Sequence, residues 1–192
     1  MNAPSVLRRQ IVTDRLVLRP TDLADAERAF VIQSDWEVAR MLRMAAFPPE
    51  REGMRAWFSD HAREWAEGSA YRSAVEAGGL MVGVVDIDEI SDRPGELGYW
   101  FDRAAWGRGY AFEAAQAAVD FAFRTVGLTR LRSGHAADNA ASGKILSKLG
   151  FRSIGTALVM SRSRGEEIRQ RSLELSASSH FQAAGHRRRD MR

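Results

Sequence analysis

The stretch WGRGYAFEAAQAAVDFAF, residues 106–123, places two glycines one residue apart directly before a long, alanine-rich segment. Apolar residues recur at helical spacing through residues 112–126, and Gly127 ends the pattern, which predicts an amphipathic helix. A glycine loop before a helix exposes unpaired backbone N–H groups at the positive end of the helix dipole, where phosphate binds well. Gly107 and Gly109 would let a phosphate approach the main chain closely. The pair therefore predicts a phosphate-binding loop, and the alternative is that it only shapes a turn.

Two common phosphate-binding motifs do not match this loop. The P-loop pattern GxxxxGK[ST] requires a lysine after its last glycine, and no lysine follows either glycine here. A Rossmann loop has a small residue at its sixth position, whereas GRGYAF places Phe112 there. The sequence therefore disfavours both folds.

The composition is that of one globular protein. The chain has 192 residues, of which 45% are hydrophobic and 28% charged, enough to bury a substantial core in a single domain. It has no cysteine, which excludes a disulfide framework, a thiolate zinc site and a cysteine nucleophile. The four histidines are scattered, so we expect no metal site. No apolar run is long enough to suggest a membrane partner, and we expect a cytoplasmic protein.

The charge distribution separates a tail from the rest of the chain. The net charge is +3, and residues 176–192 hold four arginines and one aspartate, which accounts for all of it. A neutral remainder argues against nucleic acid as a partner. We therefore expect an N-terminal extension over residues 1–10, one domain over 11–175, and a basic, disordered tail over 176–192.

Hydrophobic periodicity predicts an α+β domain with a mixed sheet. We expect strands over residues 11–19, 70–77, 80–90, 96–101, 129–136, 151–160 and 169–175, with Pro20 ending the first. We expect helices that begin near Thr21 or Asp22 and over residues 35–43, 49–67, 112–126 and 139–150.

Four segments together resemble the GNAT acyltransferase superfamily, in particular the branch of the ribosomal-protein N-terminal acetyltransferases. They are TDRLVLRPTDLADAERAF, GVVDIDE, ELGYWFDRAAWGRGYAFEA and NAASGKILSKLGF, in the family's order over about residues 11–175. The resemblance implies a single GNAT-like domain. Its central mixed, mostly antiparallel, twisted sheet would be flanked by helices, and two of its strands would splay apart at the acetyl-CoA site.

The resemblance also implies acetyl-CoA as co-substrate, and it names the residues around it. The pyrophosphate would lie on backbone amides of the loop, and the pantetheine arm would pair with the strand before it. The implied binding residues are Tyr99, Trp100, Phe101, Trp106, Gly107, Arg108, Gly109, Tyr110, Ala111, Asn139 and Ser142. Trp106 departs from the superfamily's general pattern, which has Gln or Arg there. Arg108 would add charge near the phosphates, or it is only a solvated loop residue.

Amide formation requires a base for the attacking amine and a donor for the departing thiolate. The resemblance implies Glu96 as the base and Ser142 as the donor to sulfur, both catalytic. Glu96 has the alternative of an ordinary strand-end carboxylate, and Asp86, Asp88 and Glu89 are reserve candidates. His135 is the one histidine placed to take part. Asn139 is also a good helix cap, which alone would explain it.

The acceptor is the least determined part of the prediction. An α-amine has a pKa of about 8 against about 10.4 for lysine, so a site with a modest base favours a protein N-terminus over a lysine. A small-molecule amine, such as an amino acid, a polyamine or an antibiotic, remains open. Trp36, Trp57 and Trp65 would line an acceptor groove or pack in the core. Other classes are a non-catalytic coenzyme A-binding module and a nucleic-acid binder acting through the tail. The sequence is compatible with either a monomer or a homodimer.

Overall fold

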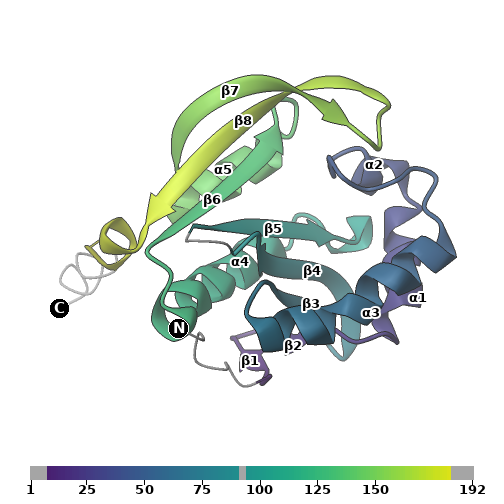
Figure 1. Cartoon of the computed structure of the whole chain (residues 1–192), viewed down its shortest axis with the longest axis horizontal. Coiled ribbons are helices and arrows are strands. Elements are labelled where there is room, and N and C mark those ends of the chain that lie inside the picture. The colour runs from purple at the N-terminus through teal and green to yellow at the C-terminus, as the bar shows by residue number, and fades with distance from the viewer. Residues whose placement is uncertain (1–7, 91–93, 183–192) are drawn as a thin grey trace.

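We describe residues 8–90 and 94–182 of a computed structural model of the chain, in which one eight-stranded sheet runs through the molecule (Figure 1). The strand order is β1-β2-β3-β4-β5-β6-β8-β7, and every neighbouring pair is antiparallel except β5 and β6. The strands are β1 (Ile11–Val12), β2 (Val17–Pro20), β3 (Tyr71–Ala77), β4 (Leu80–Asp88), β5 (Gly95–Phe101), β6 (Arg130–Ala136), β7 (Arg152–Ser161) and β8 (Glu166–Ser176). The predicted α+β fold with a mixed, mostly antiparallel sheet is confirmed.

The helices lie mostly where periodicity predicts them. They are α1 (Asp25–Gln33), α2 (Trp36–Ala39), α3 (Arg51–Glu67), α4 (Tyr110–Phe121) and α5 (Ala140–Leu149), with a 3-10 turn η1 (Arg103–Ala105) and a π-helical turn η2 (Ala122–Val126). The helix expected over residues 35–43 is only the four residues of α2. The strand expected over residues 11–19 is two short strands, because a turn closed by the bond from Thr13 N to Leu16 O, 2.9 Å, separates them.

Both faces of the central strands are buried, each against a different set of helices. Along β4, Val85 and Ile87 belong to one hydrophobic cluster with α4 and α5, while Val84 belongs to a second with α1 and α3. This is why LMVGVVDID is apolar almost throughout rather than alternating. The central strands are therefore held rigidly from two sides.

The C-terminal segment differs from the expected disordered tail in the part that the structure describes. Residues 177–182 are helical. His180 Nε2 lies 2.9 Å from Asp120 Oδ1 and its ring packs 5.5 Å from that of Phe123, so this turn docks behind α4. His180 and Phe181 both pack against Phe123 and anchor the segment. The prediction of disorder rested on the basic residues of the tail and overlooked these two rings. Residues 183–192 lie outside the described residues, as do residues 1–7 of the expected extension.

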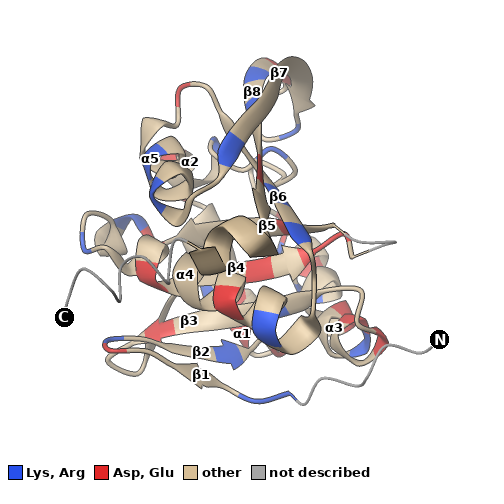
Figure 2. Cartoon of the chain, turned by 90° about the vertical axis from the view of Figure 1, so that its left-hand side faces the viewer, with Lys and Arg blue, Asp and Glu red and all other residues tan. Residues whose placement is uncertain are grey.

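The surface carries both signs of charge. Figure 2 shows lysine and arginine interspersed with aspartate and glutamate along the ribbon, with no large face of one sign in that view. Within residues 8–90 and 94–182, no helix has the length and apolar character needed to cross a bilayer. The expectation of a cytoplasmic location stays a prediction.

The buried His61 of α3 generates a prediction about stability. Its Nδ1 lies 2.8 Å from Thr21 Oγ1, and its Nε2 is buried with no hydrogen-bond partner among the described residues. Burial, followed by the charge of Arg72, lowers the pKa of His61 from 6.5 to about 4. Between these values the unfolded chain binds a proton that the folded chain does not, so the free energy of unfolding falls as the pH drops from about 6.5 toward 4. Urea unfolding at several pH values measures this slope, and His61→Gln should flatten it; an unchanged slope would assign the pH dependence to other groups.

Candidate active site

The neighbouring strands β5 and β6 part after a very short pairing. Within residues 8–90 and 94–182, the paired residues are Gly95 with Leu131 and Glu96 with Arg132. One step further along, Ser133 Oγ donates to Leu97 O at 2.9 Å, so a side chain takes the place of the next main-chain bond. Beyond that point the two halves of the sheet, β1 to β5 on one side and β6, β8 and β7 on the other, diverge (Figure 1). This parting opens the middle of the sheet.

The parting leaves the main chain of Tyr99 facing the opening. Asp102 N donates to Val82 O at 2.8 Å, and in an antiparallel pair such bonds alternate, so even-numbered residues of β5 bond to β4 while Leu97, Tyr99 and Phe101 face β6. The carbonyls of Leu97 and Phe101 accept from Ser133 Oγ and from Trp106 Nε1, the latter at 3.0 Å. Between these two caps, no bond from β6 reaches the N–H and C=O of Tyr99 among the described residues, so they are available to an extended ligand. Trp106 thus has a structural use where the superfamily's pattern has Gln or Arg.

The glycine loop has the backbone that the sequence predicts. Gly107 and Gly109 have φ of +75° and +80°, in the left-handed region that glycine tolerates best. Residues 106–109 are exposed, and Gly109 is the N-cap of α4 with no side chain accepting from the helix. The first N–H groups of α4 therefore point outward without a capping side chain, at the end of the helix that attracts anions.

A residue far away in the sequence braces this loop. Arg15, in the turn between β1 and β2, donates from Nη1 to Arg108 O at 2.8 Å and pairs with Glu113 Oε2 at 2.6 Å. Its guanidinium also lies 5.1 Å from the centre of the Tyr110 ring. Sequence reasoning missed Arg15, because about a hundred residues separate it from the loop and no local pattern connects them.

The helix α5 forms the other side of the opening. Asn139 caps it, with Oδ1 accepting from Ser142 N at 3.1 Å, as predicted. Ser142 Oγ lies 2.9 Å from Tyr99 Oη, a contact that crosses from α5 to β5. Lys148 Nζ lies 3.9 Å from the centre of the Phe112 ring, which brings a positive charge to the start of α4.

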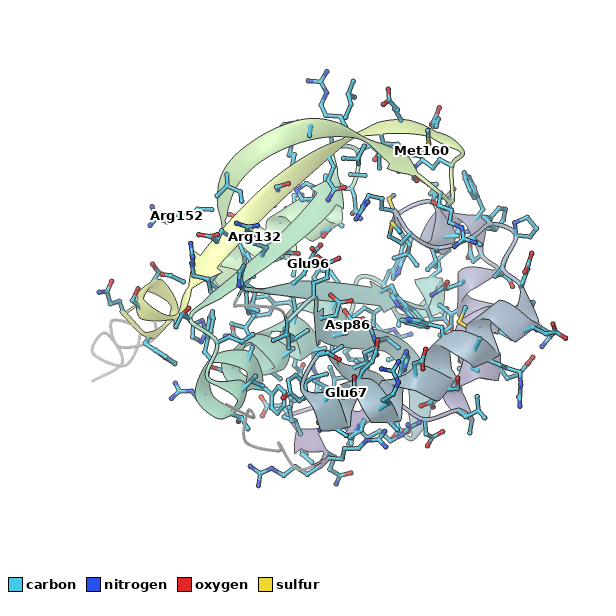
Figure 3. The ribbon with its side chains drawn as sticks, in the orientation of Figure 1. Glu67, Asp86, Glu96, Arg132, Arg152 and Met160 are labelled. Carbon is cyan, nitrogen blue, oxygen red and sulfur yellow. The ribbon has the colours of Figure 1, made fainter. Side chains whose placement is uncertain are left out.

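A cavity of about 1140 Å³ occupies the parting and reaches the acidic face of the sheet. Figure 3 labels Glu96 and Asp86, which lie on the neighbouring strands β5 and β4 and both line the cavity. Asp86 stands opposite Gly98, where a Cβ would come within 2.3 Å of its Oδ1, so the carboxylate occupies the space that the glycine leaves. Arg72 of β3 donates from Nη1 to Asp86 and to Asp88, both at 2.9 Å. The result is a row of charges across three strands.

Two of the carboxylates that line the cavity, Glu96 and Asp86, are shifted toward the neutral form. Burial, then the charges of Glu89 and Asp88, raises the pKa of Glu96 above its usual range, and Arg43 opposes the rise. Burial raises the pKa of Asp86 to about 7, helped by Asp88 and opposed by Arg72. A carboxyl with a raised pKa in a cavity is a common feature of catalytic sites, because it can accept a proton near neutral pH.

Comparison with known proteins identifies the family. Residues 15–152, most of the chain, match the acetyltransferase (GNAT) domain family model. The chain belongs to the GNAT acetyltransferase family. It is 27% identical over 162 residues to the uncharacterized N-acetyltransferase p20 of Bacillus licheniformis. The aligned region covers 82% of this chain and 90% of that protein. The predicted resemblance is confirmed, and the chain is an N-acetyltransferase that uses acetyl-CoA.

Solved structures share the fold of this acetyltransferase. The RimL ribosomal L7/L12 alpha-N-protein acetyltransferase in complex with coenzyme A superposes with a TM-score of 0.80 at 18% identity, covering 89% of this chain and 99% of that one. The microcin C7 self immunity acetyltransferase MccE, in complex with acetyl-CoA and AMP, has a TM-score of 0.76 at 17% identity, covering 91% and 98%. At such identities the likeness shows the fold alone.

The residues present fit acetyl-CoA. The outward N–H groups after Gly107 and Gly109 suit a pyrophosphate, and the free main chain of Tyr99 suits an amide-bearing arm. When bound, acetyl-CoA supplies an activated acyl group as a thioester. The individual contacts of this acetyltransferase with its co-substrate stay predictions.

The other residues predicted for the site lie partly at the cavity and partly in the hydrophobic core. Of the three tryptophans considered for an acceptor groove, Trp57 lines the cavity, Trp65 is buried in the core, and the ring of Trp36 lies 4.8 Å from that of Phe47, centre to centre, at a tilt of 56°. The backbone beyond Leu97 borders the cavity, but the side chains of Trp100 and Phe101 are buried in the two cores. His135 packs under α5, where a Cβ on Gly143 would lie 3.0 Å from its ring. Its Nδ1 is engaged at 2.8 Å with Ala136 O.

The loop generates a prediction with a close control. Gly107→Ala should raise the dissociation constant of acetyl-CoA at least about tenfold, because a methyl group would stand where the phosphate approaches. It should also lower stability by about 1–2 kcal/mol, the cost of an alanine at positive φ. Gly78→Ala, in the turn between β3 and β4, has a φ of +60° and equally open space, so it should cost similar stability without affecting the coenzyme. Titration calorimetry compares the two variants; equal affinities would make the glycine pair a turn and nothing more.

Proposed function

We propose that this enzyme transfers the acetyl group of acetyl-CoA directly to the α-amino group of a protein or peptide N-terminus. The observation that carries the proposal concerns two of the carboxylates that line the cavity, Glu96 and Asp86, which lie beside the parting of β5 and β6 and have raised pKa values. A neutral amine must reach the thioester there, and it must lose a proton as the C–N bond forms.

In the proposed reaction, the amine nitrogen attacks the acetyl carbonyl, the C–N bond forms and the C–S bond breaks. Glu96 takes the proton that the amine loses, directly or through water. The electron pair of the broken bond goes to the coenzyme sulfur, and the hydroxyl of Ser142 donates a hydrogen bond to it. The protein forms no covalent bond with the acetyl group.

The choice of an α-amine rests on the basicity of the carboxylate that must remove a proton from the amine. A free α-amine with a pKa of about 8 is partly neutral at physiological pH, whereas a lysine with a pKa of about 10.4 is almost entirely protonated. A carboxyl whose pKa is raised by burial can deprotonate the first readily and the second poorly. The fold likeness to RimL, described as an alpha-N-protein acetyltransferase, supports the same choice.

A small-molecule amine is the second candidate acceptor. Its support is the fold likeness to MccE, solved with acetyl-CoA and AMP, whose TM-score of 0.76 is close to the 0.80 of RimL. A cavity of about 1140 Å³ also has room for a small acceptor beside the coenzyme arm. A coenzyme A-binding module without catalysis predicts binding and no thiol release with any amine.

A pair of peptides tests the acceptor. One has a free N-terminus and no lysine; the other has the same sequence with a blocked N-terminus and one lysine. We expect acetyl-CoA to release free thiol with the first and not with the second. Release with the lysine peptide would contradict the α-amine. Release only with small amines such as polyamines would favour the second candidate.

Replacing the base tests the chemistry. Glu96→Gln should lower kcat by about 10²–10⁴-fold near neutral pH, the usual contribution of a general base. In the wild type, kcat/KM should fall as the pH drops below the raised pKa of the base, because the protonated carboxyl accepts no proton. Glu67→Gln, the same change on an exposed part of α3, is the control and should leave the rate unchanged. If Glu96→Gln retains activity while Asp86→Asn loses it, with acetyl-CoA still bound, Asp86 is the base.

A further inference from the structure

The hydrogen bond between Tyr99 and Ser142 joins the two sides of the open sheet. Tyr99 belongs to β5 and Ser142 to the first turn of α5, and their hydroxyl oxygens are 2.9 Å apart. A second distance, from Tyr99 Oη to Ser142 O, is 3.4 Å, too long for a good O–H···O bond. Both residues line the cavity. The pair thus joins β5 to α5 at the wall of the cavity.

The hydroxyl of Ser142 bonds outside its own helix. Ser142 is the third residue of α5, so no complete helical turn precedes it whose carbonyl its hydroxyl could bond. Among the described residues, the hydrogen-bond partner of Ser142 Oγ is Tyr99. Asn139 Oδ1 holds the backbone N–H of the same serine. The cap therefore fixes the main chain of Ser142, and Tyr99 fixes its side chain.

The hydroxyls of Tyr99 and Ser142 carry one hydrogen each, and the bond between them uses one of the two. If Tyr99 donates to Ser142 Oγ, the serine hydrogen is directed elsewhere, and no other acceptor within the described parts of the chain takes it. A phenol is the more acidic of the two groups and hence the better donor. The serine hydrogen is then available to a ligand atom in the cavity.

We propose that Tyr99 is a positioning residue for the acetyl transfer, which donates to Ser142 Oγ and so directs the serine hydroxyl toward the departing coenzyme sulfur. This inference rests on the proposed function and adds to it a residue that does not touch the reacting atoms through its hydroxyl. The sulfur keeps the electron pair of the broken C–S bond, and the serine hydrogen stays on its oxygen.

The electrostatics favour hydrogen-bond donation over proton transfer. Burial raises the pKa of Tyr99 to about 12, and its bond to Ser142 opposes the rise. A thiol has a pKa of about 8.5, so a thiolate is too weak a base to remove a proton from this pair. The pair therefore remains protonated across the working pH range and stabilises the thiolate as a fixed dipole.

Four variants test the inference: Tyr99→Phe, Ser142→Ala, the double variant, and Ser142→Thr, which keeps a hydroxyl. We expect Tyr99→Phe to lower kcat about tenfold, the scale of one neutral hydrogen bond, with the dissociation constant of acetyl-CoA and the KM of the acceptor changed less than about twofold. Ser142→Ala should lower kcat about 10²-fold. The double variant should match Ser142→Ala within about twofold, because Tyr99 acts through the serine. Ser142→Thr should retain most of the activity and most of its sensitivity to Tyr99→Phe.

The control is Tyr71→Phe, which removes a phenol hydroxyl from β3, in a packed region beside Trp65 and Phe121, and should leave kcat unchanged. Wild-type kcat in Tyr99→Phe, or losses that multiply in the double variant, would overturn the inference. A raised dissociation constant for acetyl-CoA at unchanged kcat would also overturn it, because Tyr99 would then only bind the coenzyme. A wild-type enzyme that binds acetyl-CoA but acetylates no amine would overturn the proposed function itself, and the inference with it.

Discussion

The parting of β5 and β6 is the constraint on which the rest of the site depends. Two adjacent parallel strands would normally satisfy each other's main chain over their full length, and among the described residues β5 and β6 do so at two residue pairs. At one end of the open stretch the hydroxyl of Ser133 donates to the carbonyl of Leu97, and at the other end the indole of Trp106 donates to the carbonyl of Phe101. What remains free is the main chain around Tyr99. An opening of this kind is stable only because β4 holds β5 along its whole other edge, and because helices cover both faces.

Buried charge follows from the same opening. Asp86 and Glu96 lie where the sheet would otherwise be filled by apolar side chains, and their pKa values are raised because water is scarce there. Arg72 compensates part of that cost through its bonds to Asp86 and Asp88, and its side chain is only 10% exposed. The missing side chain of Gly98 makes room for Asp86. The protein thus keeps carboxyl groups near the neutral form beside the place where an amine must lose its proton.

Two further contacts connect distant parts of the chain to the site. Arg15 ties the β1–β2 turn to the glycine loop, and Arg164 ties the β7–β8 turn to Asp138, just before the cap of α5, with bonds of 2.9 and 3.0 Å. Arg164 also donates to Arg40 O at 2.7 Å, at the end of α2. These arginines fix loops that have little core of their own. A planar guanidinium suits this task, since it can bind a carboxylate and a carbonyl at once.

The sequence by itself determined the order of the elements, the glycine loop before α4, the cap at Asn139 and the family. Each of these rests on a local pattern: helical spacing, strand alternation, a left-handed glycine or a capping side chain a few residues from its target. Periodicity predicted a helix longer than the observed α2 and a single strand where β1 and β2 are separate. The conformation of such short segments depends on the elements packed against them more than on their own sequence. The tertiary structure alone decided that β5 and β6 part, that Tyr99 meets Ser142, that Arg15 braces the loop, and that Asp86 shares a row with Arg72 and Gly98. Those contacts join residues from 12 to 93 positions apart, and their energies depend on burial and geometry that no local pattern encodes.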